Sequence, residues 1–281
     1  MPEAEGAPMT EAEGTPMPAD RASTPAPRVM PLRAGPRALP GAGPRAAPRA
    51  GARPASRSGP VAVDSAPAIL TLSSRNYSSW SLRGWLLTRF SGLPFEERMV
   101  PADDATVRAE MLLLAASNRV PCLTHAGTEI WDTLAIAEYL NEIRPEARLL
   151  PEARAARARC RSICGEMHSG FAAMRSALPM NLKARFPGFK VWSRAQADID
   201  RITTIWNECL QASGGPYLFG ARTTADAMYA PVATRFATYD VALDPVCAAY
   251  RDTILAMPEM REWTAAARLE PEDIDELEVE F

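Results

Sequence analysis

The chain has 281 residues and a formal net charge of −3, with five cysteines and two histidines. That length is enough for one or two domains with a sizeable core. No segment approaches the ~20 apolar residues of a membrane-spanning helix, so we expect no membrane association. The odd number of cysteines, without CxxC or zinc-like spacing, fits reduced thiols in a cytoplasmic protein, and two isolated histidines predict no metal site.

Residues 1–66 differ sharply in composition from the rest of the chain. They hold 13 of the 26 prolines and none of the aromatic residues. Such a segment cannot bury enough apolar surface to offset the entropy of ordering, so we predict a disordered Pro/Ala/Arg-rich extension. Three interpretations remain open: a tail that binds acidic partners, a targeting segment, or an over-long gene prediction whose true start lies downstream, for example at Met30.

The remaining residues, 67–281, hold 23 basic and 28 acidic side chains, a formal charge of −5. A mildly acidic globular part argues against a dedicated nucleic-acid-binding fold. Residues 270–281 carry seven of these acids. We therefore expect 269–281 to be a solvated acidic tail.

Residues 67–145 alternate between segments suited to strands and segments suited to helices. Gly92-Leu93-Pro94 predicts the end of the first helix, because a glycine cap followed by proline stops helices. In chain order we expect a strand at Ala68–Leu72, a helix at 82–90, a strand at 95–100, a short helix at 106–114, strands at 118–124 and 129–131, and a helix at 132–140. The order β-α-β-α-β-β-α predicts a small mixed sheet with helices on both faces.

Residues 152–268 are helical in character almost throughout. Thr223 and Asp226 have the spacing of a capping box, in which each side chain satisfies an unpaired N–H at a helix start. The expected helices are 152–177, Ser193–Ser213, 224–241, 245–257 and 259–267. Together the two halves predict an α+β chain, with an all-α part after a mixed sheet.

The turn at 77–83 places three serines between the first strand and the first helix. The first backbone N–H groups of a helix lack internal partners and carry partial positive charge. Such a junction can hold an anion or a thiolate. The alternative is that one serine caps the helix and does nothing more.

These motifs, in this order and spacing, make residues 68–268 resemble a cytosolic glutathione transferase of bacterial type. The marks are the serine-rich turn, Val120-Pro121 before a strand, Asp132-Thr133 opening a helix, and the box of Thr223 and Asp226. The resemblance implies a thioredoxin-like glutathione-binding domain at 67–145, an all-α domain at 152–268, and a homodimer.

Within that family, the turn from Ser78 to Arg83 is most similar to the SSCSxR motif of the zeta class, the maleylacetoacetate isomerases. It departs at Trp80, where that class has cysteine, and at Gly84-Trp85, where a Val-Arg pair is expected. No cysteine occupies the activating turn, so reduction chemistry through a cysteine is disfavoured.

The resemblance assigns activation of the glutathione thiol to Ser78, with Ser79 as second choice and Ser81 expected to cap or pack. A thiol has a pKa near ~8.5, and lowering it by ~2 units needs about 2.7 kcal/mol of preferential stabilisation of the thiolate. A serine hydroxyl that donates to sulfur at a helix N-terminus supplies energy of this order.

The resemblance also gives roles to the two other motifs. Val120, before a cis-Pro121, would pair its backbone with the cysteinyl part of glutathione. Asp132 would accept from the γ-glutamyl ammonium, and Thr133 would hold the γ-glutamyl carboxylate. The alternatives are a strand-edge proline and an ordinary helix cap.

The electrophile is expected between the two halves, against the first long helix of the second. There His168, Phe171 and Arg175 fall along one predicted helical face, so that Arg175 would receive an anionic acceptor and Phe171 an apolar one. The alternative is a packed face with a surface ion pair.

Three functions follow from the resemblance. The first is a transferase for detoxification, which adds glutathione, its co-substrate, to a small electrophile without a metal. The second is a glutathione-dependent cis–trans isomerase, which charged residues across the acceptor cleft would favour. The third is a non-catalytic binding or stress adaptor, which an intact glutathione site would disfavour.

Overall fold

The computed structural model describes residues 67–100 and 120–270, which lie within one compact unit of the chain, Ser56–Phe281. The expectations for the extension at 1–66, for the short helix at 106–114 and for the tail after residue 270 lie outside the described residues.

The first half of the described chain forms a four-stranded mixed sheet. Its strands are β1 (Ala68–Leu72), β2 (Glu96–Met99), β3 (Cys122–His125) and β4 (Thr128–Ile130), in the spatial order β2-β1-β3-β4. β1 pairs with β2 in parallel, whereas the β1–β3 and β3–β4 pairs are antiparallel. Alternate residues of β1 are buried, because successive side chains of a strand point to opposite faces. The predicted mixed sheet is confirmed.

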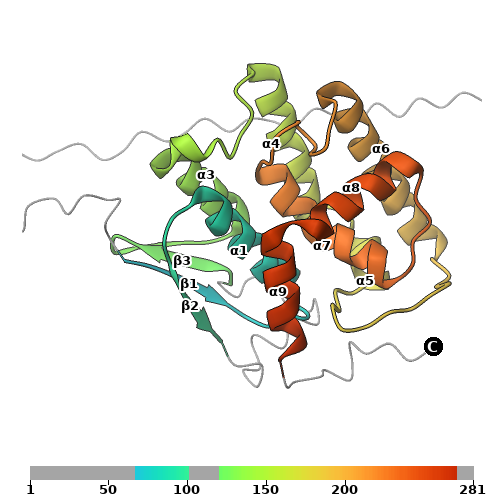
Figure 1. The fold of residues 1–281 in the computed structure, drawn as a ribbon, viewed down its shortest axis with the longest axis horizontal. Coiled ribbons are helices and arrows are strands. Elements are labelled where there is room, and N and C mark those ends of the chain that lie inside the picture. Colours follow the sequence, from blue (N-terminus) through green and yellow to red (C-terminus); the bar gives the residue numbers. More distant parts are fainter. Residues whose placement is uncertain (1–66, 101–119, 271–281) are drawn as a thin grey trace, which may run out of the picture. The chain divides into compact units, whose positions relative to one another are not determined.

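Two helices accompany this sheet, α1 (Ser79–Ser91) and α3 (Thr133–Ile143), and they pack against each other. α1 ends at Gly92, whose φ of 70° is left-handed, as the sequence predicted. It begins at Ser79, one turn earlier than expected, because Ser78 supplies the N-cap. In Figure 1, α1 lies between the sheet and α7, which it contacts.

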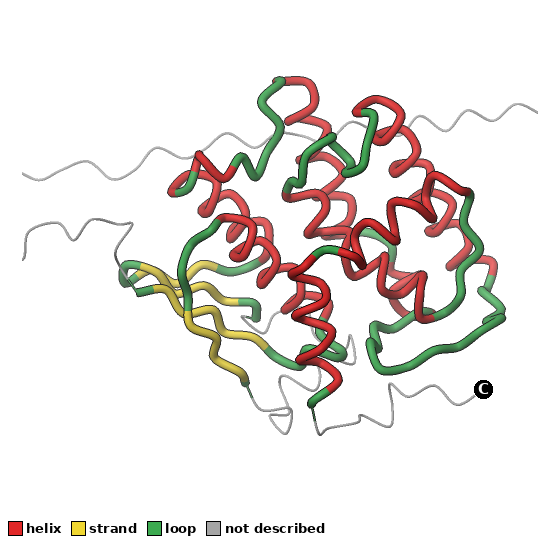
Figure 2. The backbone as a smooth tube through the Cα atoms, in the orientation of Figure 1, coloured by secondary structure: helices red, strands yellow, loops and turns green. Residues whose placement is uncertain are grey.

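The second half is helical, as predicted, and follows a short 3-10 helix at Pro145–Ala147. Figure 2 shows these helices joined by loops, with no strand drawn among them. They are α4 (Arg154–Ser169), α5 (Ala172–Ala177), α6 (Ser193–Ser213), α7 (Thr224–Thr238), α8 (Pro245–Ala256) and α9 (Pro258–Arg268). None of the helices in the described ranges is long and apolar enough to span a bilayer.

The single helix expected at 152–177 is wrong. The chain breaks between α4 and α5 at Gly170-Phe171, where Phe171 has a left-handed φ of 60°. A Cβ at Gly170 would lie 2.7 Å from the carbonyl oxygen of Glu166, so this turn suits a residue without a side chain.

One hydrophobic cluster runs through both halves. It includes Leu70 and Leu123 of the sheet, Leu86 of α1, and Trp206 and Met228 of the helical region. The boundary expected between 67–145 and 152–268 therefore stays a prediction. The shared core fixes α1, and with it the serine turn, against the helical region.

Candidate functional site

The serine turn is a buried N-cap. Ser78 has a relative exposure of 4%, and its Oγ accepts a hydrogen bond of 3.2 Å from the Ser81 N–H. Ser81 packs instead of capping, with its Oγ accepting from the Ser73 N–H at 2.9 Å. Ser79, the first residue of α1, is also buried. Of the three serines, the structure therefore gives the capping role to Ser78.

The loop before this cap is held by Glu270, which follows α9. Glu270 accepts hydrogen bonds from the Ser74 hydroxyl at 2.7 Å and from the backbone N–H groups of Arg75 and Asn76 at 2.6 and 3.0 Å. The Ser74 carbonyl in turn accepts from the Ser78 N–H. The prediction of a solvated tail is therefore wrong at Glu270, its second residue, because loop N–H groups bind that carboxylate.

Val120 and Pro121 join through a cis peptide bond. Pro121 lies directly against α1, since a Cβ built on Gly84 would approach the Pro121 Cβ to 2.5 Å. Only glycine fits this contact without movement. Gly84 was a departure from the zeta pattern, and the structure gives its reason.

Asp132 and Thr133 open α3. Asp132 is the N-cap, with Oδ1 accepting from the Leu134 N–H at 2.9 Å, and Thr133 is fully buried. His168 reaches both residues: its Nε2 lies 3.2 Å from Asp132 Oδ2, and its Nδ1 lies 3.4 Å from Thr133 Oγ1. The last residues of α4 thus contact the start of α3.

Trp80, which lies in the serine turn, contacts His168. Its ring centroid lies 5.1 Å from that of His168. The guanidinium carbons of Arg83 and Arg175 each lie 4.8 Å from the Trp80 ring centroid, within cation–π range. We did not predict site roles for Trp80 and Arg83. Their position in the serine turn could have indicated such roles, because Trp80 replaces the cysteine of the related motif and Arg83 matches its arginine.

His168, Phe171 and Arg175 do not share a helical face, which corrects the prediction. Phe171 is buried in the turn between α4 and α5. Arg175 folds back on the end of α4 and donates to the carbonyls of Met167 and Gly170. It therefore satisfies unpaired helix-end carbonyls while its guanidinium carbon stays near Trp80.

Burial lowers the pKa values of three arginines, and for two of them repulsion from neighbouring arginines adds to the effect. Desolvation and the neighbouring Arg175 and Arg235 hold the pKa of Arg83 well below its usual value. Desolvation lowers the pKa of Arg175 to about 10, and desolvation and Arg175 lower that of Arg235 to about 9. Arg83 donates to the Met228 carbonyl, but its buried Nη2 has no hydrogen-bond partner among the described residues.

The His168 pKa is also lowered. Desolvation is the main cause, the Asp132 carboxylate opposes it, and Arg83 and Arg175 add to it. The lowered pKa favours the neutral imidazole at neutral pH. The Asp132 carboxylate beside it is therefore not paired with a histidine cation.

All five cysteines are buried. No group of three or more potential metal ligands occurs within 67–100 and 120–270. The described site presents hydroxyl, carboxylate, imidazole and guanidinium groups.

Comparison with known proteins gives one family match and many structural matches. Residues 77–143 match the family model described as the glutathione S-transferase N-terminal domain. A search of curated proteins finds no significant match.

Several solved structures share the fold. A glutathione transferase homolog from Burkholderia with bound glutathione is 23% identical, has a TM-score of 0.54, and matches 72% of this chain and 98% of its own. A maleylacetoacetate isomerase from Anaeromyxobacter dehalogenans 2CP-1, with bound dicarboxyethyl glutathione and citrate, is 23% identical with a TM-score of 0.54, over 74% of this chain and 98% of its own. The Omega 1C glutathione transferase of Trametes versicolor is 13% identical with a TM-score of 0.53, over 72% and 95%.

The sequence of residues 77–143 thus matches the glutathione S-transferase N-terminal domain, and the described chain has the fold of the glutathione transferases.

Proposed function

We propose that this protein activates the thiol of glutathione and adds it to a small electrophile. One observation carries the proposal: a buried serine, Ser78, caps the helix that also packs on cis-Pro121. In the family that residues 77–143 match, these features serve glutathione.

Ser78 has the chemistry to activate a thiol. In its hydrogen bond with the Ser81 N–H the hydroxyl oxygen accepts, so its proton is free to be donated to sulfur. The positive end of α1 adds to the stabilisation of a thiolate. Together the hydroxyl and the helix N-terminus can supply stabilisation of the thiolate of the order of the ~2.7 kcal/mol that a two-unit fall in thiol pKa requires.

The remaining parts of glutathione have proposed partners in two motifs. The backbone of Val120 pairs with the cysteinyl unit. Asp132 accepts from the γ-glutamyl ammonium, and Thr133 binds the γ-glutamyl carboxylate at the start of α3. Because the lowered pKa keeps His168 neutral, it does not compete for Asp132 as a cation.

A second candidate function is glutathione-dependent cis–trans isomerisation of an anionic substrate. The observation that favours it is the group of Arg83 and Arg175 at Trp80, where the buried Arg83 Nη2 lacks a partner among the described residues. The isomerase that shares this fold was solved with dicarboxyethyl glutathione, a carboxylate-bearing adduct. Trp80 in place of cysteine is the feature that separates this chain from that class.

Ultraviolet titration of glutathione bound to the full chain tests the proposed thiol activation. We expect a bound-thiol pKa at least one unit below ~8.5. Ser78→Ala should abolish the shift, and so should Ser78→Asn, which keeps a good helix cap but removes the hydroxyl. Ser79→Ala is the matched control and should retain it.

A shift that survives both Ser78 substitutions would move the role to Ser79 or to the helix terminus alone. Failure of the chain to bind glutathione would overturn the proposal and leave the adaptor interpretation. Incubation with a cis-dicarboxylate then separates the two reactions, because an isomerase regenerates free glutathione whereas a transferase consumes it.

The resemblance also implies a homodimer, a cytoplasmic location and a role in detoxification. We keep these as proposals. Sedimentation of the full chain tests the first.

A further inference from the structure

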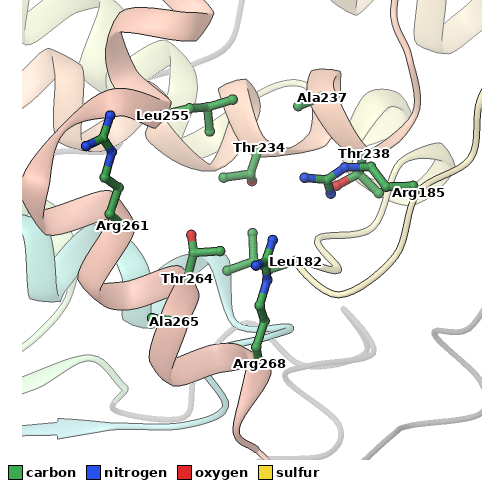
Figure 3. Close-up of a pocket in the computed structure, with 10 residues that line it drawn as sticks. All are labelled: Leu182, Arg185, Thr234, Ala237, Thr238, Leu255, Arg261, Thr264, Ala265 and Arg268. Carbon is green, nitrogen blue, oxygen red and sulfur yellow. The ribbon is translucent and has the colours of Figure 1, made fainter.

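A cavity that is open to solvent lies away from the serine turn. It has a volume of about 330 Å³ and is bordered by α7, α9, Leu255 of α8 and the segment at 182–185. None of its lining residues belongs to the candidate glutathione site. Figure 3 shows it as an open space between the facing sides of α7 and α9.

The cavity exists because the facing helix positions carry small side chains. α7 contributes Thr234, Ala237 and Thr238, and α9 contributes Thr264 and Ala265. These positions recur every three or four residues on one face of each helix. In a packed core such positions hold large apolar residues that leave few voids, so the small threonine and alanine side chains here keep space open.

Three arginines surround this space: Arg185, Arg261 and Arg268. Within the described part of the chain, no acidic residue lines the cavity, and none of the three makes an ion pair. Elsewhere on the surface, arginines such as Arg161 and Arg201 pair with carboxylates. In Figure 3, Arg185 and Arg268 extend toward the centre of the cavity.

The threonines add acceptors of hydrogen bonds. The Thr234 hydroxyl donates to the Pro231 carbonyl at 2.8 Å, and the Thr238 hydroxyl donates to the Asn181 carbonyl at 3.1 Å. Each oxygen therefore keeps lone pairs for a donor. The cavity combines guanidinium groups for an anion with oxygens that accept from hydroxyl groups.

We propose that this cavity binds a small phosphate ester that carries hydroxyl groups, such as a sugar phosphate. The arginines bind the phosphate through paired N–H donors, and the threonine oxygens accept from the hydroxyls. The volume suits such a small ligand, since ligand pockets begin at about 300 Å³.

Isothermal titration of the full chain with glucose 6-phosphate tests this proposal. We expect saturable binding that the double variant Arg185→Gln, Arg268→Gln weakens at least tenfold. The matched control is Arg154→Gln, Arg194→Gln, which removes the same charge from exposed helix starts and should change the affinity less than twofold. Ala265→Leu fills an exposed edge of the cavity without changing charge and should also weaken binding.

Absence of saturable binding, or equal losses in the two double variants, would overturn the proposal. Inorganic phosphate that binds as tightly as glucose 6-phosphate would overturn the assigned ligand class.

Discussion

The two sides of the candidate site differ in how they are built. The side that we propose binds glutathione comprises Ser78, Val120, Pro121, Asp132 and Thr133. The side that we propose receives the acceptor comprises Trp80, Arg83, His168 and Arg175. On the glutathione side each residue lies at the start of a helix or strand, where its own chain segment orients it. On the acceptor side each residue is positioned by contacts with a distant segment, such as Arg83 with the carbonyl of Met228. Local sequence motifs therefore specify the position of each residue on the first side, whereas for the second side the sequence named His168 and Arg175 but not their contacts.

The largest expected effect tests how α1 meets the proline of the glutathione side. Gly84→Val restores the zeta pattern, but the new side chain would overlap Pro121, whose Cβ would lie only 2.5 Å from a Cβ added at Gly84. We expect a loss of about 3 kcal/mol in the free energy of unfolding, measured with urea. Gly165→Ala in α4, where nothing lies within 4 Å of the added Cβ, should instead stabilise the fold by ~0.5 to 1 kcal/mol. Equal effects of the two changes would contradict the close contact.

The acceptor side is tested by Arg175→Met. The substitution leaves the Met167 and Gly170 carbonyls without the donor that now caps α4, so we expect about 2 kcal/mol of destabilisation by urea unfolding. Arg154→Met, at an exposed position in the same helix, should change stability by less than about 0.5 kcal/mol. A variant at Arg175 as stable as the parent would mean that relief of the buried charge offsets the lost hydrogen bonds.

Glu270→Ala removes the clamp on the loop before Ser78. Three donors lose their acceptor at a partly buried site, and we expect about 1.5 kcal/mol of destabilisation. Hydrogen exchange at the Arg75 and Asn76 amides should accelerate as well. Glu262→Ala, which breaks only an exposed pair with Arg89, should cost less than about 0.5 kcal/mol and leave that exchange unchanged. If hydrogen exchange at the Arg75 and Asn76 amides is unchanged in the Glu270 variant, the assigned role of Glu270 in holding the loop is contradicted.

Ser78→Ala tests the cap separately from the chemistry. Loss of the acceptor for the Ser81 N–H should cost about 1 kcal/mol of stability, whereas Ser78→Asn should stay near the parent. Ser79→Ala, inside the first turn, should have a smaller effect than Ser78→Ala. A larger loss at Ser79 would contradict the assigned N-cap.

The smallest expected effect is on the titration of His168. Its NMR titration midpoint should lie below the usual 6.5, because burial and nearby arginines disfavour the imidazolium. Asp132→Asn should lower the midpoint further by removing the opposing carboxylate. Because the folded pKa is depressed, protonation of His168 costs folding free energy, so its stability contribution is lost as pH falls through that pKa. The only other histidine is His125, and His125→Gln assigns the signals. A midpoint at or above 6.5 would contradict the burial of His168 between the two halves.

Sequence patterns were enough to predict the order of strands and helices, the glycine end of α1, the helix starts at Asp132 and Thr223, and the resemblance of residues 68–268 to glutathione transferases. These features follow from caps, turns and apolar periodicity, which act within a few residues. For the same reason the glutathione side could be proposed residue by residue.

Long-range packing determined the rest. It turned Arg175 back onto α4 and brought His168 to Asp132. It also placed Glu270 on the loop before Ser78. Each of these outcomes depends on a partner in another element of the fold, and no local pattern specifies which carbonyl, carboxylate or ring a side chain meets once the core is packed.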